Sequence, residues 1–146
     1  MFSGAKNRYS TRDIKIIGTD MSLYVAQICS GGIVRWVNNT VVGPIATNFF
    51  QTFNADIGFF SSIGLTFEDG FTDADVLESQ ARHVMSQACK KTVLILQSDK
   101  IGVRSATTTF KIEEVDVLIT DNNAPTETVG ELKSRGLEVL IVDCVK

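Results

Sequence analysis

Several features that mark large classes of proteins are missing from this chain of 146 residues. No apolar run is long enough to span a bilayer, and the N-terminal sequence lacks the apolar core of a signal peptide. Positive charge is not in excess, since 14 basic and 17 acidic residues give a net charge of −3. This balance argues against the chain holding DNA or RNA through its phosphates by itself. We therefore expect a cytoplasmic protein with no membrane segment.

Cysteine and histidine, the usual zinc ligands, are also few. Cys29, Cys89 and Cys144 lie far apart and form no CxxC pair, so buried reduced thiols are expected. His83 is the only histidine, which disfavours a zinc site and a Cys–His catalytic pair. Neither GxGxxG nor GxxxxGK[ST] occurs, so no nucleotide motif supports a cofactor. We expect neither a metal nor a cofactor.

What the chain does contain is an alternation of apolar runs and helical patterns. Helices are expected from Thr40, after an N-cap within 72–75, and from Pro125 to Gly136, whereas 64–73 is expected to be a loop. Short apolar runs bounded by polar turns predict buried strands at 14–17, 23–29, 33–37, 56–61, 92–97, 115–120 and 137–142. The apolar positions expected to be buried are Val41, Ile45, Phe49 and Phe53 in the first helix, and Leu77, Ala81, Val84, Met85 and Ala88 in the second.

Strands that alternate with helices predict an α/β fold, with a mostly parallel sheet flanked by helices. We expect one domain over residues 14–146, preceded by an irregular polar segment, 1–13. In open α/β sheets, ligands bind beyond the carboxyl ends of the strands. Polar residues that follow the expected strands are therefore candidates for ligand binding.

Lys100 follows the strand expected at 92–97. It could point a positive charge at an anionic ligand, or be a solvated turn lysine. Asp99 beside it, and Asp121 after the next strand, supply carboxylates at the same edge. One such acid next to a lysine could transfer a proton. The sequence pattern, however, supports a ligand-binding crevice better than it supports a catalytic site.

Three other groups each have two interpretations. Gly31-Gly32 could bring backbone N–H groups close to an anion or form an ordinary turn. Ser61, Ser62 and Gly64 could line a polar pocket or form a hydroxyl-capped turn. The third group is Glu78 and Arg82, spaced i, i+4 on a helix, which could bind a ligand or form a surface pair worth roughly a few tenths of a kcal/mol.

Seven short motifs, taken in order, resemble the C-terminal effector domain of DeoR-type repressors of sugar operons. The resemblance covers roughly Ile14 to Asp143. It implies a Rossmann-like fold shared with ribose-5-phosphate isomerase and glucosamine-6-phosphate deaminase. The motifs are Gly31-Gly32, TVVGP at 40–44, ADIGFFS at 55–61, GFT at 70–72, ESQAR at 78–82, SDKIG at 98–102 and VDVLITD at 115–121.

The resemblance also implies a phosphorylated sugar as effector, a homo-oligomer, and DNA binding through a separate N-terminal winged helix-turn-helix domain. Lys100 and Arg82 would face the anion, the glycine pair would allow close approach, and Ser61, Ser62 and Glu78 would bond sugar hydroxyls. The matched positions are Gly31 and Gly32 beside the crevice, 61–64 at the strand end, Glu78 and Arg82 on the helix, Lys100 after the next strand, and Thr19 with Asp20 at the family's Thr-Asn step.

The sequence departs from the family pattern in several places. It has neither the winged helix-turn-helix nor the Asp-x-Gly-Thr-Thr phosphate loop, so we expect a fragment truncated at its N-terminus and lacking a backbone N–H cradle. Asp20 replaces an amide, Arg82 stands where lysine is common, and 61–63 lacks the aspartate of the isomerases. That missing base weakens the enzyme alternative.

The leading hypothesis is therefore a non-enzymatic sensor of a phosphorylated sugar. One alternative is a sugar-phosphate isomerase or deaminase that uses Asp99 or Glu78 as its base. Another is a structural remnant that mediates only oligomerisation.

Overall fold

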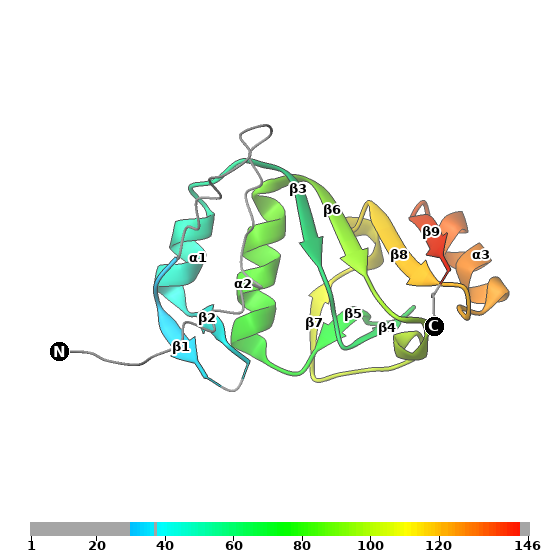
Figure 1. Ribbon diagram of the computed structural model, residues 1–146, viewed down its shortest axis with the longest axis horizontal. Helices are drawn as coiled ribbons and strands as arrows, with labels where there is room; N and C mark the ends of the chain where they lie inside the picture. Colours follow the sequence, from blue (N-terminus) through cyan, green and yellow to red (C-terminus); the bar gives the residue numbers. More distant parts are fainter. Residues whose placement is uncertain (1–29, 37, 144–146) are drawn as a thin grey trace.

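A computed structural model describes residues 30–36 and 38–143 (Figure 1). Four strands form a parallel sheet in the order β3 (Ala55–Phe60), β6 (Cys89–Ile95), β8 (Val117–Asp121) and β9 (Glu138–Val142). All four were expected from the sequence, although β6 begins three residues earlier than expected. The strands predicted at 14–17 and 23–29 lie outside the described residues, as do Thr19, Asp20, Cys29 and Cys144.

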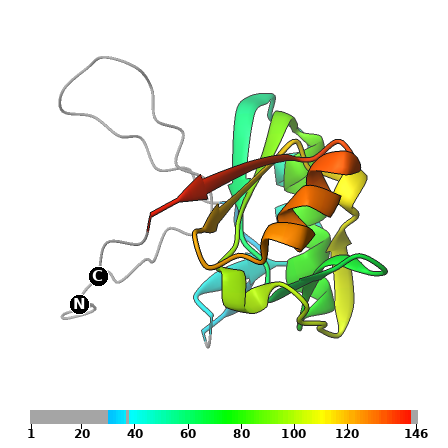
Figure 2. The ribbon, with the colours of Figure 1, turned by 90° about the vertical axis from the view of Figure 1, so that its right-hand side faces the viewer.

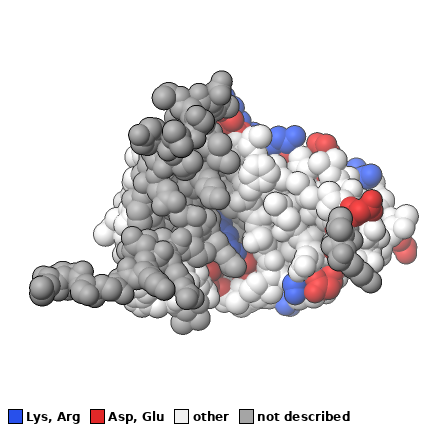
Figure 3. Space-filling model, in the orientation of Figure 1, with Lys and Arg blue, Asp and Glu red and all other residues white. Residues whose placement is uncertain are grey.

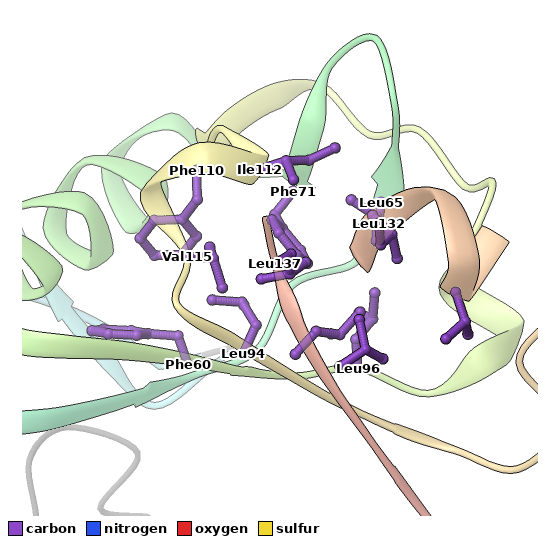
Figure 4. Close-up of a cluster of buried hydrophobic side chains, with 13 residues drawn as sticks. Phe60, Leu65, Phe71, Leu94, Leu96, Phe110, Ile112, Val115, Leu132 and Leu137 are labelled. Carbon is purple, nitrogen blue, oxygen red and sulfur yellow. The ribbon is translucent and has the colours of Figure 1, made fainter. Parts of the chain in front are cut away.

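One face of this sheet carries the core. Phe60, Leu94, Leu118 and Val139 stand side by side across the four strands, because their Cα atoms are register partners. They pack against α3 (Thr126–Ser134), which lies beside β9 (Figure 2), and against a three-stranded antiparallel sheet. The buried cluster in Figure 4 consists of Phe60, Leu65, Phe71, Leu94, Leu96, Phe110, Ile112, Val115, Leu118, Val129, Leu132, Leu137 and Val139.

The opposite face of the parallel sheet is more open. Ile57 and Phe59 of β3 are 49% and 63% exposed, and Ile95 of β6 and Leu140 of β9 are 50% and 45% exposed. Figure 3 shows a largely uncharged surface over β3, β6 and β8, with charged side chains around its margin. The apolar run at 92–97 predicts a strand buried on both faces, and this is wrong at Ile95 of β6, although Val93 on the same face is buried.

The small antiparallel sheet corrects the loop predicted at 64–73. β4 (Gly64–Thr66) and β5 (Gly70–Asp73) form a hairpin, and β7 (Thr107–Phe110) pairs with β5. Leu65 and Phe71 of the hairpin are buried in the core. Strands of three or four residues are too short for a period-two pattern to be distinguished from a loop.

The helix predicted from Thr40 also needs correction. Thr40–Val42 forms β2, which pairs antiparallel with β1 (Ile33–Arg35), and α1 (Pro44–Phe50) begins only at Pro44. Gly43 separates the two elements at φ +93°, a left-handed conformation that ends the strand. The predicted stripe is wrong, since Ile45 is 66% exposed whereas the buried residues of α1 are Ala46 and Phe50.

The long helix α2 (Val76–Gln87) has its N-cap, Asp75, within the predicted cap segment 72–75. The Asp75 carboxylate accepts hydrogen bonds from the backbone N–H groups of Leu77 and Glu78, at 2.9 and 3.0 Å. Its buried residues are Glu78, Ser79 and Ala81, so the burial predicted for Ala81 is confirmed. Leu77 is exposed instead, because α2 turns a polar face towards β7, where Ser79 Oγ lies 2.8 Å from Thr109 Oγ1.

Several other expectations concern groups that the structure describes only in part. Cys89 is a free, half-buried thiol whose pKa is raised by burial. Among residues 30–36 and 38–143, no cluster of three or more His, Cys, Asp or Glu side chains could hold a metal ion. In the same residues, none of the helices is both long and apolar enough to cross a membrane.

Candidate functional site

A cavity of about 440 Å³ lies between β2, α2 and the carboxyl ends of β3 and β6. Its position fits the rule that α/β sheets bind ligands beyond their strand ends. Polar side chains of Thr40, Glu78 and Arg82 stand among apolar ones on its wall. The complete lining is Thr40, Val41, Val42, Phe59, Phe60, Ser61, Glu78, Ala81, Arg82, Met85 and Ile95.

Glu78 joins the cavity wall to the turn between β1 and β2. Its Oε1 accepts hydrogen bonds from Asn38 Nδ2 at 2.7 Å and from Thr40 Oγ1 at 2.9 Å. Its Oε2 lies 3.6 Å from Arg82 Nη2. Glu78 is only 8% exposed, so the interpretation as a solvated surface pair does not describe its carboxylate. A buried carboxylate with these partners is held in one orientation.

Arg82 is fixed by a second carboxylate. Its Nη1 lies 2.6 Å from Asp73 Oδ1, and Nη1 also donates to the carbonyl oxygen of Ser61 at 3.4 Å. Asp73 is buried, and its other oxygen accepts from Thr109 Oγ1 at 2.7 Å. A guanidinium has five N–H donors, so these contacts leave donors for a ligand. Asp73 and Glu78 offset the charge of Arg82.

The structure brings together three of the predicted site residues. Ser61, Glu78 and Arg82 all line the cavity, as the strand-end and helix motifs led us to expect. Gly31, Gly32, Ser62, Gly64 and Lys100 do not line it. For all eight residues, ligand binding stays a prediction.

The two glycine motifs make close packing contacts within the protein. A Cβ on Gly32 would lie 2.8 Å from the carbonyl oxygen of Val42, and one on Gly64 would lie 2.1 Å from that of Val103. Ser62 Oγ donates to the carbonyl oxygen of Gly64 at 3.2 Å. Turn and packing roles therefore account for the contacts of these residues.

Lys100 ends a short 3₁₀ turn, η1 (Ser98–Lys100), beyond β6. Its Nζ lies 3.3 Å from Asp99 Oδ2, and both side chains are exposed. A second cavity, of about 270 Å³, lies nearby between the β4–β5 hairpin and the start of α3, and Ile101 and Gly102 line it. Lys100 lines neither cavity.

Asp121 ties together the carboxyl ends of β6 and β8. Its carboxylate accepts from the backbone N–H and the hydroxyl of Ser98, both at 2.7 Å, and from the backbone N–H of Asn123 at 2.9 Å. The backbone N–H of Ser98, then its hydroxyl and the N–H of Asn123, hold the pKa of Asp121 well below its usual range. These partners occupy the carboxylate in a structural role.

Several functional neighbours were not expected from the sequence. Asn38, Thr40 and Asp73 complete the setting of Glu78 and Arg82, and Arg35 forms an ion pair with Asp75 at the start of α2. Arg35, Asn38 and Thr40 each lie 38 to 40 positions from their partners, which are the N-cap Asp75 and Glu78 of α2. No local spacing signals contacts over such a separation.

Comparison with known proteins gives consistent matches. A family model described as the DeoR C terminal sensor domain matches residues 11–122. The chain is 31% identical over 119 residues to the HTH-type transcriptional regulator GolR of Listeria innocua, covering 82% of this chain and 47% of that protein. It is also 31% identical over 111 residues to the regulator GlpR of Haloferax volcanii, covering 76% and 44%.

The regulator UlaR of Shigella dysenteriae matches 84 residues at 37% identity, covering 58% of this chain and 33% of that protein. The chain spans about half the length of GolR and GlpR. The matched proteins are regulators of transcription, and the matched domain is a sensor, so the enzyme alternative is set aside. The chain belongs to the family of DeoR C-terminal sensor domains.

Proposed function

We propose that this sensor domain binds a phosphorylated sugar in the cavity beside α2. The observation that carries the proposal is Arg82, which two carboxylates orient on the cavity wall. Sugar hydroxyls donate and accept hydrogen bonds, and Glu78, Thr40 and Arg82 offer both kinds of partner. Phe59 and Ile95 add the apolar wall on which the C–H face of a sugar packs.

The roles in this proposal follow the chemistry of each side chain. Arg82 donates to a phosphate or sugar oxygen, and Glu78 accepts from sugar hydroxyls. Because Glu78 and Asp73 offset Arg82, this wall suits hydroxyl groups better than a doubly charged phosphate. The family resemblance implies further positive charge or N–H donors from Lys100, Gly31 and Gly32, which do not line this cavity and would have to approach the ligand from outside it.

The wider function rests on the family. We propose the Rossmann-like fold of ribose-5-phosphate isomerase and glucosamine-6-phosphate deaminase for residues 14–146, which agrees with the parallel sheet. In the complete, cytoplasmic and oligomeric repressor, a separate N-terminal domain would contact DNA. The effector would favour one arrangement of the protein, and operator affinity would follow that population shift.

Thermal unfolding of the chain with a panel of sugar phosphates tests the proposal. A ligand that binds only the folded state adds about 2.7 kcal/mol at 100 times its Kd. We expect ribose 5-phosphate, glucosamine 6-phosphate or a related compound to raise the Tm. Inorganic phosphate should leave the Tm unchanged. Arg82→Gln should remove the ligand-induced rise, whereas Lys133→Gln on α3 should keep it. No rise with any sugar phosphate would overturn the proposal.

A turnover assay separates binding from catalysis. The same sugar phosphates should be recovered unchanged after incubation with the chain. Any isomerised or deaminated product would overturn the sensor assignment, whatever the result of the thermal experiment.

A further inference from the structure

Strands β1 and β2 form a ribbon that stands apart from the two larger sheets. In the described part of the chain these strands pair only with each other, and Figure 1 shows them across α2 from β3 and β6. A two-stranded ribbon is at best marginally stable by itself. The position of this β1–β2 ribbon therefore depends on the elements that it touches, which include α1 and α2.

Side chains of the ribbon and of its turn bind carboxylates at the start of α2. Arg35 of β1 forms an ion pair with the N-cap residue Asp75. Asn38 in the turn and Thr40 on β2 both donate to Oε1 of Glu78, at 2.7 and 2.9 Å. One oxygen of Glu78 therefore holds both the turn and β2 against α2.

The second oxygen of Glu78 is left for a ligand. Glu78 and Arg82 line the same cavity, and Oε2 of Glu78 lies 3.6 Å from Nη2 of Arg82, which is longer than a charge-assisted hydrogen bond. Among the described residues, the hydrogen bonds that Glu78 accepts through its side chain both end on Oε1. The same carboxylate therefore offers one oxygen to the ribbon and the other to the cavity.

We propose that Glu78 couples the occupancy of the cavity to the position of the β1–β2 ribbon, with Asn38 as a positioning residue for its carboxylate. This inference rests on the proposed function, in which the cavity binds a phosphorylated sugar. A ligand hydroxyl that donates to Oε2 restrains rotation of the carboxylate, and this keeps Oε1 within reach of Asn38 and Thr40. Coupling between two sites is reciprocal, so the contacts that hold the ribbon also raise the affinity for the ligand.

Hydrogen exchange of the full chain, followed by mass spectrometry, first tests the link without a ligand. Glu78→Ala should speed exchange over residues 33–42 by about fivefold or more, because local opening of the ribbon becomes easier. Glu131→Ala, which removes an exposed partner of Arg135, is the matched control and should leave exchange over 33–42 unchanged. An unchanged rate over 33–42 in Glu78→Ala would overturn the inference before any ligand is added.

The same experiment with ribose 5-phosphate and with glucosamine 6-phosphate then tests the coupling. Whichever of the two raises the Tm should slow exchange over residues 33–35 of β1 by about fivefold or more. No residue of β1 lines the cavity, so direct cover by the ligand does not explain a slower rate there. Exchange over 138–142 of β9 should stay the same.

Substitution of Asn38 tests the reciprocal effect. Asn38→Ala should raise the Kd for that sugar phosphate by about fivefold or more, although Asn38 does not line the cavity. Asn38→Gln, which keeps an amide donor, should recover part of the affinity. The matched control is Asn122→Ala, which removes an amide donor to Asp143 Oδ1 at 3.1 Å and should keep the wild-type Kd.

The outcomes separate this inference from the proposed function. A sugar phosphate that raises the Tm but leaves exchange over 33–35 at its unliganded rate would overturn the coupling alone. A wild-type Kd in Asn38→Ala would do the same. If no sugar phosphate raises the Tm, the proposed function fails and the coupling falls with it, even where Glu78→Ala speeds exchange over 33–42.

Discussion

Glu78 shows how a single buried charge is kept in this protein. A carboxylate loses hydration when it is buried, and only hydrogen bonds or ion pairs compensate for that loss. Asn38 and Thr40 donate to one oxygen, and Arg82 lies beside the other. Its place in the first turn of α2 adds the favourable field of the helix N-terminus.

Glu78→Ala is therefore expected to lower the free energy of unfolding by about 1–3 kcal/mol, since Asn38 and Thr40 lose their acceptor. Urea denaturation followed by circular dichroism measures the change. The matched control is Glu131→Ala, which removes an exposed i, i+4 partner of Arg135 at 2.8 Å. That substitution should cost less than about 1 kcal/mol. Equal losses in the two variants would contradict the structural role assigned to Glu78.

Asp121 makes a prediction about pH. Its pKa in the folded state lies below the usual value for aspartate, about 3.9. The stabilisation from the ionised carboxylate is therefore fully present above that value and is lost as the pH falls through the folded pKa. Between about pH 5 and pH 2, the gap in urea midpoint between the wild type and Asp121→Asn should shrink.

Ser98→Ala supplies the comparison for that experiment. It removes the hydroxyl donor but keeps the backbone N–H of Ser98, so part of the pKa shift of Asp121 should remain. The pH dependence of this variant should lie between those of the wild type and Asp121→Asn. A gap that stays constant with pH would show that Asp121 does not stabilise the fold through its charge.

Sequence reasoning reached some of the site at this scale. Helical spacing placed Glu78 beside Arg82, because that relation is local. The end of the expected strand placed Ser61 at the edge of the sheet where ligands bind. Asp73, Asn38 and Thr40 were missed as their partners, since contacts between separate elements depend on how those elements pack. The sequence also placed Lys100 at the ligand edge of the sheet, but the packing of the elements leaves it outside the cavity.

At the scale of elements, the β4–β5 hairpin depends on the backbone at Gly70. This residue has φ +72°, and a Cβ there would lie 2.4 Å from the carbonyl oxygen of Phe110 on β7. Two separate effects therefore require glycine. One is the left-handed conformation, and the other is the close approach of β7.

Gly70→Ala and Gly102→Ala separate these effects. Gly102 has φ +86° but no atom within 4 Å of an added Cβ, so its substitution should cost about 1–2 kcal/mol for conformation alone. Gly70→Ala should cost clearly more, because Phe110 must also move. Thermal unfolding of both variants measures the difference. Similar Tm values for the two variants would show that Phe110 on β7 moves away from the added Cβ without lowering the free energy of unfolding.

Element prediction succeeded where a pattern extends over several residues. The runs that became β3, β6, β8 and β9 are apolar and closed by turns, and α3 lies between Pro125 and Gly136. The short strands β2, β4, β5 and β7 have no such length. Their positions are fixed instead by neighbours on other parts of the chain.

At the scale of the whole molecule, the row of side chains across the parallel sheet holds the two layers together. Leu118 lies in the centre of this row and is fully buried. Leu118→Ala should lower the free energy of unfolding by about 2–5 kcal/mol, through lost burial and the cavity left behind. Leu140→Ala on β9 changes the same side chain at a 45% exposed position and should cost much less. Comparable losses in urea denaturation would contradict the one-sided core.

The order of the parallel strands in space, β3, β6, β8 and β9, is also their order along the chain. A ribosome releases these segments one after another, at about 5–20 residues per second. Each of the three later strands therefore emerges when its neighbour in the sheet has already been made. The sheet can therefore assemble strand by strand during synthesis. At each stage a chaperone would bind the exposed edge of the strand added last, and the strands added before it would already be paired.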